Sequence, residues 1–209
     1  MTQIVSRKFE PGTTGWSIED LNDPQIRRAW SNGRFEIVEG VLTMMAPQGL
    51  HTVGPLGRLR RLIERHLDAK AQGGEMITEV DVELRNNRIV RPDMMFLTAD
   101  QLRRQQTLED ERGITAEDYC PILVTPTLIV ESVSLTHEDH DWITKRAWYA
   151  EAEIPHYWLL TAHERRLDCL ELKGGQYIQT VTGRDEQVLS PPLFSVLEIE
   201  LGSLWAAKL

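Results

Sequence analysis

Three charged residues lie inside apolar segments of this chain, where solvated charges are not expected. Asp93 opens the apolar run 94–97, Glu131 interrupts the β-branched run 127–134, and Lys145 lies among tryptophan, isoleucine and tyrosine side chains. A carboxylate inside a buried strand is costly unless a cation or hydrogen-bond donors pair with it. We expect a metal ion or an ammonium group to be that partner, which makes an enzyme the leading hypothesis.

The chemistry that suits these residue types is metal-assisted hydrolysis of a phosphodiester. Mg²⁺ usually takes one or two protein carboxylates together with water and substrate oxygens, and Mn²⁺ is an alternative ion. On neighbouring strands, Asp93 and Glu131 would converge on one such ion. Asp141, Lys145 and Tyr149 are spaced i, i+4, i+8, so they share one stripe of a helix that can present the ammonium group to the carboxylates.

The elements that position these residues follow from periodicity and turn signals. Alternation and β-branched runs predict strands, spacing of three and four predicts helices, and glycine, proline or asparagine pairs mark turns. The polar segment 99–120, with weak helical character at 100–106, is expected to run over the surface. We expect a hairpin at 35–45 with Glu39-Gly40 at its turn, an amphipathic helix at 51–71, strands at 76–84 and 88–93, a central strand at 127–134, a helix from Thr136 to Glu153, and strands at 156–160, 166–172, 176–182 and 193–201.

This order of elements predicts an α/β fold with a mixed β-sheet flanked by helices and with added β-hairpins. We expect residues 1–30 to form an N-terminal extension with a short helix, and residues 31–209 to form a single domain.

Composition limits the classes of protein and partner. The net charge of −9 opposes general binding to a phosphate backbone, although arginines cluster at 58–65 and at 103–104. No apolar run is long enough for a membrane span, and the first residues lack the apolar core of a signal peptide. The two cysteines, Cys120 and Cys169, lack zinc-site spacing and are expected to be free thiols in the cytoplasm.

The ordered series of motifs resembles the Uma-type restriction endonuclease family of the PD-(D/E)XK nuclease superfamily. The resembling segments span roughly residues 30–205 and occur in the family's order. They are Phe35–Gly40, Ala46-Pro47 with His51, Arg91-Pro92-Asp93, Ile129–Ser134, Asp141 with Lys145 and 149–152, and Ile154-Pro155 with 157–159.

This resemblance implies a restriction-endonuclease-like core and a Mg²⁺-dependent endonuclease acting on nucleic acid, most simply DNA. It also implies that Asp93 and Glu131 are metal ligands, that Lys145 is the catalytic lysine, and that Glu39 and His51 support the active site. In the wider superfamily the lysine follows the glutamate by two residues. That position is Val133 here, so Lys145 would act from the helix.

Each of the three central residues also has a possible structural role. Asp93 after a proline can open a strand with its side chain in solvent. Glu131 can form a buried structural salt bridge, and Lys145 can pair with Asp141 on an exposed helix face.

The remaining candidate residues can likewise be structural. Glu39 before a glycine is a common turn residue, and His51 can simply begin a helix. His137 and His140, with His163 beyond them, lack further clustered ligands, which disfavours zinc. The tryptophans at 142, 148 and 158 are more typical of a core than of a base-stacking surface.

Two further functions remain open from the sequence. A non-catalytic interaction protein with a nuclease fold would explain the acidic charge, and so would a hydrolase of a small phosphate ester. The apolar segment 193–205 suggests a homodimer interface.

Overall fold

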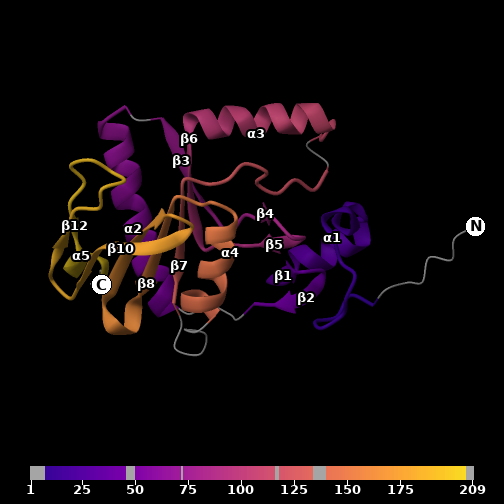
Figure 1. The fold of residues 1–209 in the computed structure, drawn as a ribbon, viewed down its shortest axis with the longest axis horizontal. Helices are drawn as coiled ribbons and strands as arrows, with labels where there is room; N and C mark the ends of the chain where they lie inside the picture. The colour runs from indigo at the N-terminus through magenta and orange to yellow at the C-terminus, as the bar shows by residue number, and fades with distance from the viewer. Residues whose placement is uncertain (1–7, 46–49, 72, 116–117, 134–139, 206–209) are drawn as a thin grey trace, which may run out of the picture.

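The computed structural model describes residues 8–45, 50–71, 73–115, 118–133 and 140–205. Its central feature is a six-stranded sheet in the order β10-β9-β8-β7-β6-β3 (Figure 1). The strands are β3 (Gly74–Thr78), β6 (Met94–Thr98), β7 (Leu128–Ser132), β8 (His156–Thr161), β9 (Arg166–Lys173) and β10 (Gln176–Arg184).

The sheet is mixed, as the sequence predicts. Strands β7 and β8 are parallel, and the other neighbouring pairs are antiparallel. All five residues of β7 are buried, which explains why its sequence is almost continuously apolar. The one charged residue in this central strand, Glu131, is therefore held between the two layers that cover the sheet.

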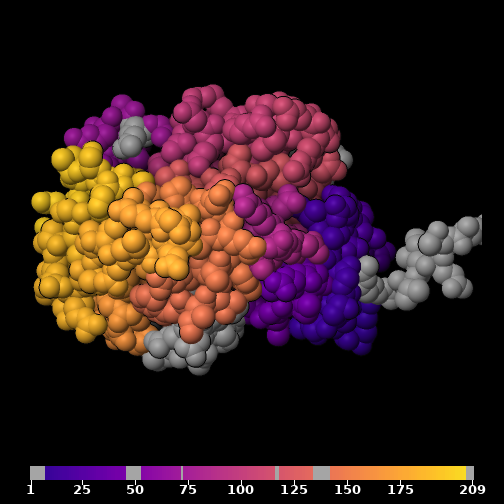
Figure 2. Space-filling model, viewed as in Figure 1, coloured from indigo at the N-terminus to yellow at the C-terminus, as the bar shows by residue number. Residues whose placement is uncertain are grey.

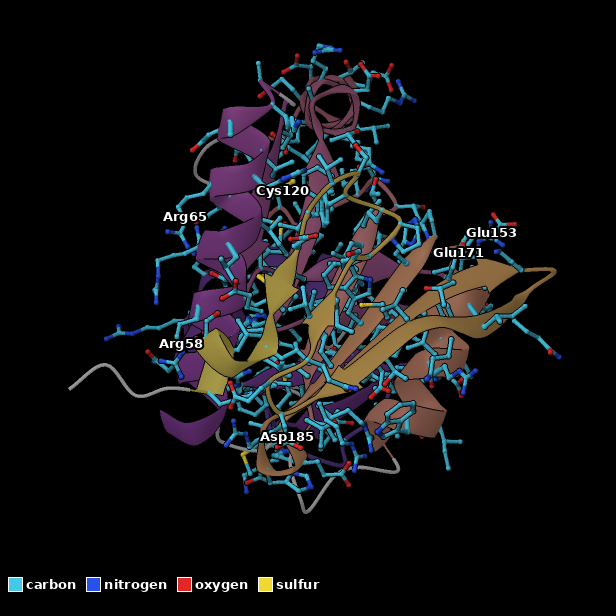
Figure 3. The ribbon with its side chains drawn as sticks, turned by 90° about the vertical axis from the view of Figure 1, so that its left-hand side faces the viewer. Arg58, Arg65, Cys120, Glu153, Glu171 and Asp185 are labelled. Carbon is cyan, nitrogen blue, oxygen red and sulfur yellow. The ribbon has the colours of Figure 1, made fainter. Side chains whose placement is uncertain are left out.

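Helices lie on opposite sides of the large sheet (Figure 3). Helix α2 (Leu50–Ala69) buries Leu56, Leu59, Ile63 and Leu67 against one face. Helix α4 (Arg146–Glu151), which continues the π-helical turn η2 (His140–Lys145), packs Tyr149 against the other. The even-numbered residues of β7 face α2 and the odd-numbered residues face α4, so Glu131 faces α4.

A second, four-stranded antiparallel sheet has the order β2-β1-β5-β4 and forms one end of the molecule with the N-terminal segment (Figure 2). The predicted hairpin is confirmed, with Glu39 and Gly40 at its turn in the left-handed region, at φ 53° and 80°. The elements are η1 (Ile18–Asn22), α1 (Pro24–Ser31), β1 (Phe35–Val38), β2 (Val41–Met44), β4 (Val82–Leu84) and β5 (Arg88–Val90).

Three predicted elements differ from the structure. In the expected extended piece at 193–201 the one strand is β12 (Ile199–Glu200), after a series of turns. The expected strand at 76–84 is broken at Glu79, whose φ of 54° turns the chain out of the large sheet, so that β3 and β4 lie in different sheets. The expected surface excursion at 99–120, with weak helical character at 100–106, begins with helix α3 (Ala99–Arg112), which is longer than the sequence indicates. A capping box between Thr98 and Gln101 begins this helix, and Gly113 ends it at φ 67°.

The C-terminal segment packs within its own chain. Apart from Val196, its large apolar residues are buried or partly buried against α2 and the large sheet. The apolar pattern that suggests a dimer interface is thus explained inside one chain. The segment contains β12 (Ile199–Glu200), which pairs with β11 (Val188–Leu189), and α5 (Leu201–Trp205).

The N-terminal segment shares a hydrophobic core with the small sheet. Trp16, Leu21 and Trp30 pack against Ile37 and Ile89. Across the described ranges, no helix has both the length and the apolar character needed to cross a lipid bilayer.

Candidate active site

Asp93, which directly precedes β6, and Glu131, in the neighbouring antiparallel strand β7, lie side by side. Met94 pairs with Val130, so the next position in register sets Asp93 opposite Glu131. The backbone N–H of Asp93 donates to Glu131 Oε2 at 3.3 Å, and the backbone N–H of Ser132 donates to Asp93 Oδ2 at 2.7 Å. Both carboxylates are buried, so neither is the solvent-exposed side chain that a strand end would allow.

The pKa of Asp93 is raised to about 7, first by burial and next by the nearby charge of Glu131. Lys145, the Ser132 N–H and Arg34 act in the opposite direction. The ionised form of Asp93 is therefore disfavoured unless further positive charge arrives.

Lys145 and Tyr149 both reach the same oxygen of Glu131. Lys145 Nζ lies 3.0 Å from Glu131 Oε1, and the Tyr149 hydroxyl donates to that atom at 2.6 Å. Their spacing of four residues places them on one stripe of the helical segment, as the sequence predicts. Lys145 is only 5% exposed, so it is not a lysine paired on an exposed helix face. Burial and the charge of Glu131 hold the pKa of the Tyr149 hydroxyl well above its ordinary value.

Glu36 is a further acidic residue of this site, and the sequence motifs do not single it out. It is buried in β1, and its Oε1 lies 3.5 Å from Lys145 Nζ. Alternation in β1 is the signal that could have found it, because Phe35 and Ile37 face the small core while Glu36 faces the other side. Glu36, Asp93, Glu131 and Lys145 together form a carboxylate–lysine cluster.

The two predicted supporting residues are placed differently. Glu39 lies at the β1–β2 turn with its side chain 64% exposed, and it forms an ion pair with Arg88 at 2.6 Å. The structure does not bring it to the cluster. His51 lies in the first turn of α2, but its side chain falls outside the part that the structure describes.

The tryptophans and histidines form no second site in the described structure. Trp158 is a core residue, and Trp148 is buried beneath the Arg88 guanidinium. No zinc-like cluster of histidines forms among the described residues, although His137 and the side chain of His140 lie outside them.

The segment that carries Asp93 is anchored by a buried polar network centred on Asp81. Arg91 donates from Nε to Asp81 Oδ1 at 2.7 Å and from Nη2 to Oδ2 at 3.1 Å. Trp30 Nε1 and the Tyr119 hydroxyl each donate to Oδ2 at 2.7 Å. This bidentate pair fixes the chain two residues before Asp93, where it passes from the small sheet to the large one.

The donor atoms of the cluster fit a hard divalent cation. Carboxylate oxygens are the ligands that Mg²⁺ and Mn²⁺ prefer, and Glu36 Oε1 is buried without a hydrogen-bond partner in the described structure. Within the described ranges no three His, Cys, Asp or Glu side chains already converge as a metal-binding group. The protein would thus supply one or two carboxylates, and water and substrate oxygens would complete the coordination, as is usual for Mg²⁺.

Comparison with known proteins supports the resemblance drawn from the motifs. A family model described as "Putative restriction endonuclease" (Uma2) matches residues 25–202. A solved structure of a "putative nuclease belonging to DUF820" from Anabaena variabilis ATCC 29413 is similar, with a TM-score of 0.62 and 13% identity. The match covers 83% of this chain and 90% of that chain, and at this identity it shows the shared fold alone.

No curated protein matches the chain. The family model nevertheless covers most of its length and includes every residue of the carboxylate–lysine cluster. The chain therefore belongs to the Uma2 family, whose description is "Putative restriction endonuclease".

Proposed function

We propose that this protein is a divalent-metal-dependent endonuclease that hydrolyses phosphodiester bonds of DNA. The observation that carries the proposal is a buried group of three carboxylates, Glu36, Asp93 and Glu131, that faces two cations. Lys145 contacts Glu36 and Glu131, and Arg34 lies 3.5 Å from Asp93. A purely structural set of ion pairs would need only one carboxylate for each cation. The excess negative charge at the end of two neighbouring strands favours a site that takes up a cation.

In this proposal Asp93 and Glu131 hold Mg²⁺ or Mn²⁺, with Glu36 next to them. A bound divalent cation supplies electrostatic stabilisation of the negatively charged transition state and lowers the pKa of water. Water adds across one P–O bond, so that the products are a phosphate monoester and an alcohol. Lys145 stabilises negative charge on the phosphate, and Tyr149 orients Glu131 through its hydroxyl.

Glu36 takes the supporting role that the family resemblance assigns to Glu39, because Glu36 is buried beside Lys145 and Glu39 is exposed. His51 remains part of the proposal as a supporting residue at the start of α2.

The cytoplasm is the proposed location, since Cys120 and Cys169 are both free thiols.

We do not include a homodimer in the proposal, because the apolar segment 193–205 that suggested one is largely buried in its own chain.

Two different functions would use the same cluster in different ways. A non-catalytic interaction protein would need no metal, and a small phosphate ester would suit a chain with a net charge of −9. The buried excess of carboxylates disfavours the first, and membership of a restriction endonuclease family favours a nucleic acid over the second.

The test is cleavage of supercoiled plasmid in Mg²⁺, Mn²⁺ or EDTA by the wild type, by Asp93→Asn and by Asp100→Asn. Asp100 is an exposed aspartate of α3 and serves as the matched control. We expect metal-dependent nicking by the wild type and the control, and a loss of roughly a thousandfold in Asp93→Asn. Nicking that persists in EDTA or in Asp93→Asn would refute the proposal. Hydrolysis of bis(4-nitrophenyl) phosphate without plasmid cleavage would indicate that the substrate is a small phosphate ester and not DNA.

A further inference from the structure

Arg34 is directed toward the same site as Glu36. It directly precedes β1 and stands two residues before Glu36, so the alternation of an extended chain places both side chains on one face. Phe35, between them, packs into the small core on the other face. No sequence motif singles out this arginine.

The guanidinium of Arg34 has weakly held contacts. Its Nη2 lies 3.5 Å from Asp93 Oδ1, well beyond the 2.7–2.9 Å typical of a strong charge-assisted hydrogen bond. Its Nη1 donates at 3.0 Å to Glu79, whose side chain is 55% exposed. Exposed ion pairs of this kind contribute little to stability. Arg34 Nε is buried and has no hydrogen-bond partner in the described part of the chain.

Of the two cations that the structure describes at the site, Arg34 is the one that a ligand in solution can reach. Its side chain is 24% exposed, whereas that of Lys145 is 5% exposed. Arg58 and Arg65 of α2 are less well placed. Figure 3 shows Arg58 and Arg65 extending from the outer side of α2, on the opposite side of the large sheet from α4. Arg34 therefore forms the partly exposed edge of the carboxylate–lysine cluster beside Asp93, and this edge is here called the mouth of the cluster.

We propose that Arg34 binds a non-bridging oxygen of the substrate's phosphate group at this mouth. The proposal rests on the proposed function and identifies a phosphate-binding residue within it. A planar guanidinium with five donors suits phosphate oxygens, and Arg34 has an unused Nε–H and two contacts that it can give up at small cost. Its present contact with Asp93 would then be a resting contact, made when no phosphate is bound.

The competing role for Arg34 is a structural one, as part of an ion-pair chain from Glu79 to Asp93. Three variants separate the two roles. Arg34→Gln removes the charge, and Arg34→Lys keeps the charge but lacks the planar guanidinium. Glu79→Gln breaks the ion-pair chain while keeping Arg34. Arg85→Gln is the matched control, because Arg85 is an exposed arginine paired with Glu153 outside the cluster.

The experiment measures affinity for a fluorescein-labelled DNA duplex by anisotropy, with Ca²⁺ in place of Mg²⁺, over a range of salt concentrations. Calorimetry of Mn²⁺ binding without DNA, and plasmid cleavage, complete the set. We expect Arg34→Gln to weaken duplex binding roughly tenfold. The slope of the logarithm of the affinity against the logarithm of the salt concentration, here called the salt slope, should decrease by the amount of about one phosphate contact. The Mn²⁺ affinity of Arg34→Gln should stay within about threefold of the wild type. Arg34→Lys should recover part of the loss, and Glu79→Gln and Arg85→Gln should bind like the wild type.

Several results would overturn the role of Arg34. These are equal effects of Glu79→Gln and Arg34→Gln, a parallel loss of Mn²⁺ binding in Arg34→Gln, an unchanged salt slope, or a wild type that binds no duplex. The proposed function fails separately. A wild type that binds the duplex through Arg34 but never cleaves it would support the phosphate contact and refute the nuclease.

Discussion

At the scale of single residues, the chemistry of the site centres on one atom, Glu131 Oε1. This oxygen receives both the ammonium group of Lys145 and the hydroxyl of Tyr149, while Oε2 accepts from the backbone of Asp93. The side chain of Glu131 is thus held in one orientation from three sides. A carboxylate fixed in this way can hold a ligand in place without losing further conformational entropy.

Removal of the Tyr149 hydroxyl tests this orientation. Because the raised pKa keeps Tyr149 protonated, it donates to Glu131 throughout the ordinary pH range. We expect Tyr149→Phe to lower the cleavage rate roughly tenfold or more. The control is Tyr177→Phe, which removes another buried hydroxyl, bonded to the Ile154 carbonyl outside the cluster. If both variants changed the rate equally, the effect would be one of packing and the orienting role of Tyr149 would be wrong.

The raised pKa of Asp93 predicts how stability depends on pH. Between the ordinary value of 3.8 and about 7, the folded protein binds this proton and the unfolded chain does not. The free energy of unfolding therefore falls as pH rises through this interval. In EDTA, we expect Asp93→Asn to raise the free energy of unfolding at pH 8 by roughly 1–3 kcal/mol and to change it little near pH 4. Urea denaturation at the two pH values measures this, and a destabilised variant at pH 8 would contradict it.

The sequence identifies Asp93, Glu131 and Lys145 as candidates because a charge in an apolar run has few explanations, and the structure brings these three together. The family resemblance, and not a pattern in the residues, points to Glu39 rather than Glu36. The alternation of β1, which sets Glu36 on the face opposite Phe35 and Ile37, could have identified Glu36. Arg34 escapes prediction for another reason. Its ion-pair partners Glu79 and Asp93 are distant from it in sequence, and no local pattern predicts these contacts.

At the scale of elements, the important segment is the passage from β5 to β6. It leaves the small sheet at Val90, is anchored by Arg91, and enters the large sheet immediately after Asp93. Pro92 restricts the backbone of the residue before it, which favours the extended conformation of this passage. The Asp81 network therefore determines where Asp93 stands relative to β7.

Loss of this network should lower the stability of the folded protein. We expect Asp81→Ala to lower the free energy of unfolding by about 3–5 kcal/mol, because it leaves Arg91 as a buried charge without its bidentate partner. Chemical denaturation measures this. Asp100→Ala, at an exposed aspartate, should stay within about 0.5 kcal/mol of the wild type. Similar values for the two variants would show that the network does not anchor the segment.

Elements with strong periodicity are predictable from the sequence, and those defined by special backbone conformations are not. Strand β7 and helix α2 follow directly from apolar spacing. Helix α3 does not, since it is polar on most sides and buries only Gln105 fully. Its capping box at Thr98 is the signal that could have revealed it. The break at Glu79 depends on a positive φ in a residue that rarely adopts one, and alternation alone cannot reveal it.

At the scale of the whole molecule, the site forms where three parts of the chain meet. Glu36 comes from the small sheet, Asp93 directly precedes β6 of the large sheet, Glu131 lies in β7, and Lys145 comes from the end of η2 where α4 begins. Because no single part contains the cluster, the complete packing of both sheets is needed to assemble it. With a net charge of −9, the attraction for a polyanion has to come from local cations and bound metal, so activity should be sensitive to salt.

The decisive measurement for the carboxylate–lysine cluster is the rate of plasmid cleavage in Mg²⁺ by the wild type, Glu36→Gln and Glu39→Gln, each repeated in EDTA. The two variants remove the same charge from one hairpin, and only Glu36 lies in the cluster. We predict that EDTA abolishes cleavage, that Glu36→Gln loses on the order of a hundredfold or more, and that Glu39→Gln stays within about twofold of the wild type. Full activity in Glu36→Gln with loss in Glu39→Gln, or cleavage that continues in EDTA, would contradict a metal-dependent nuclease built on this cluster.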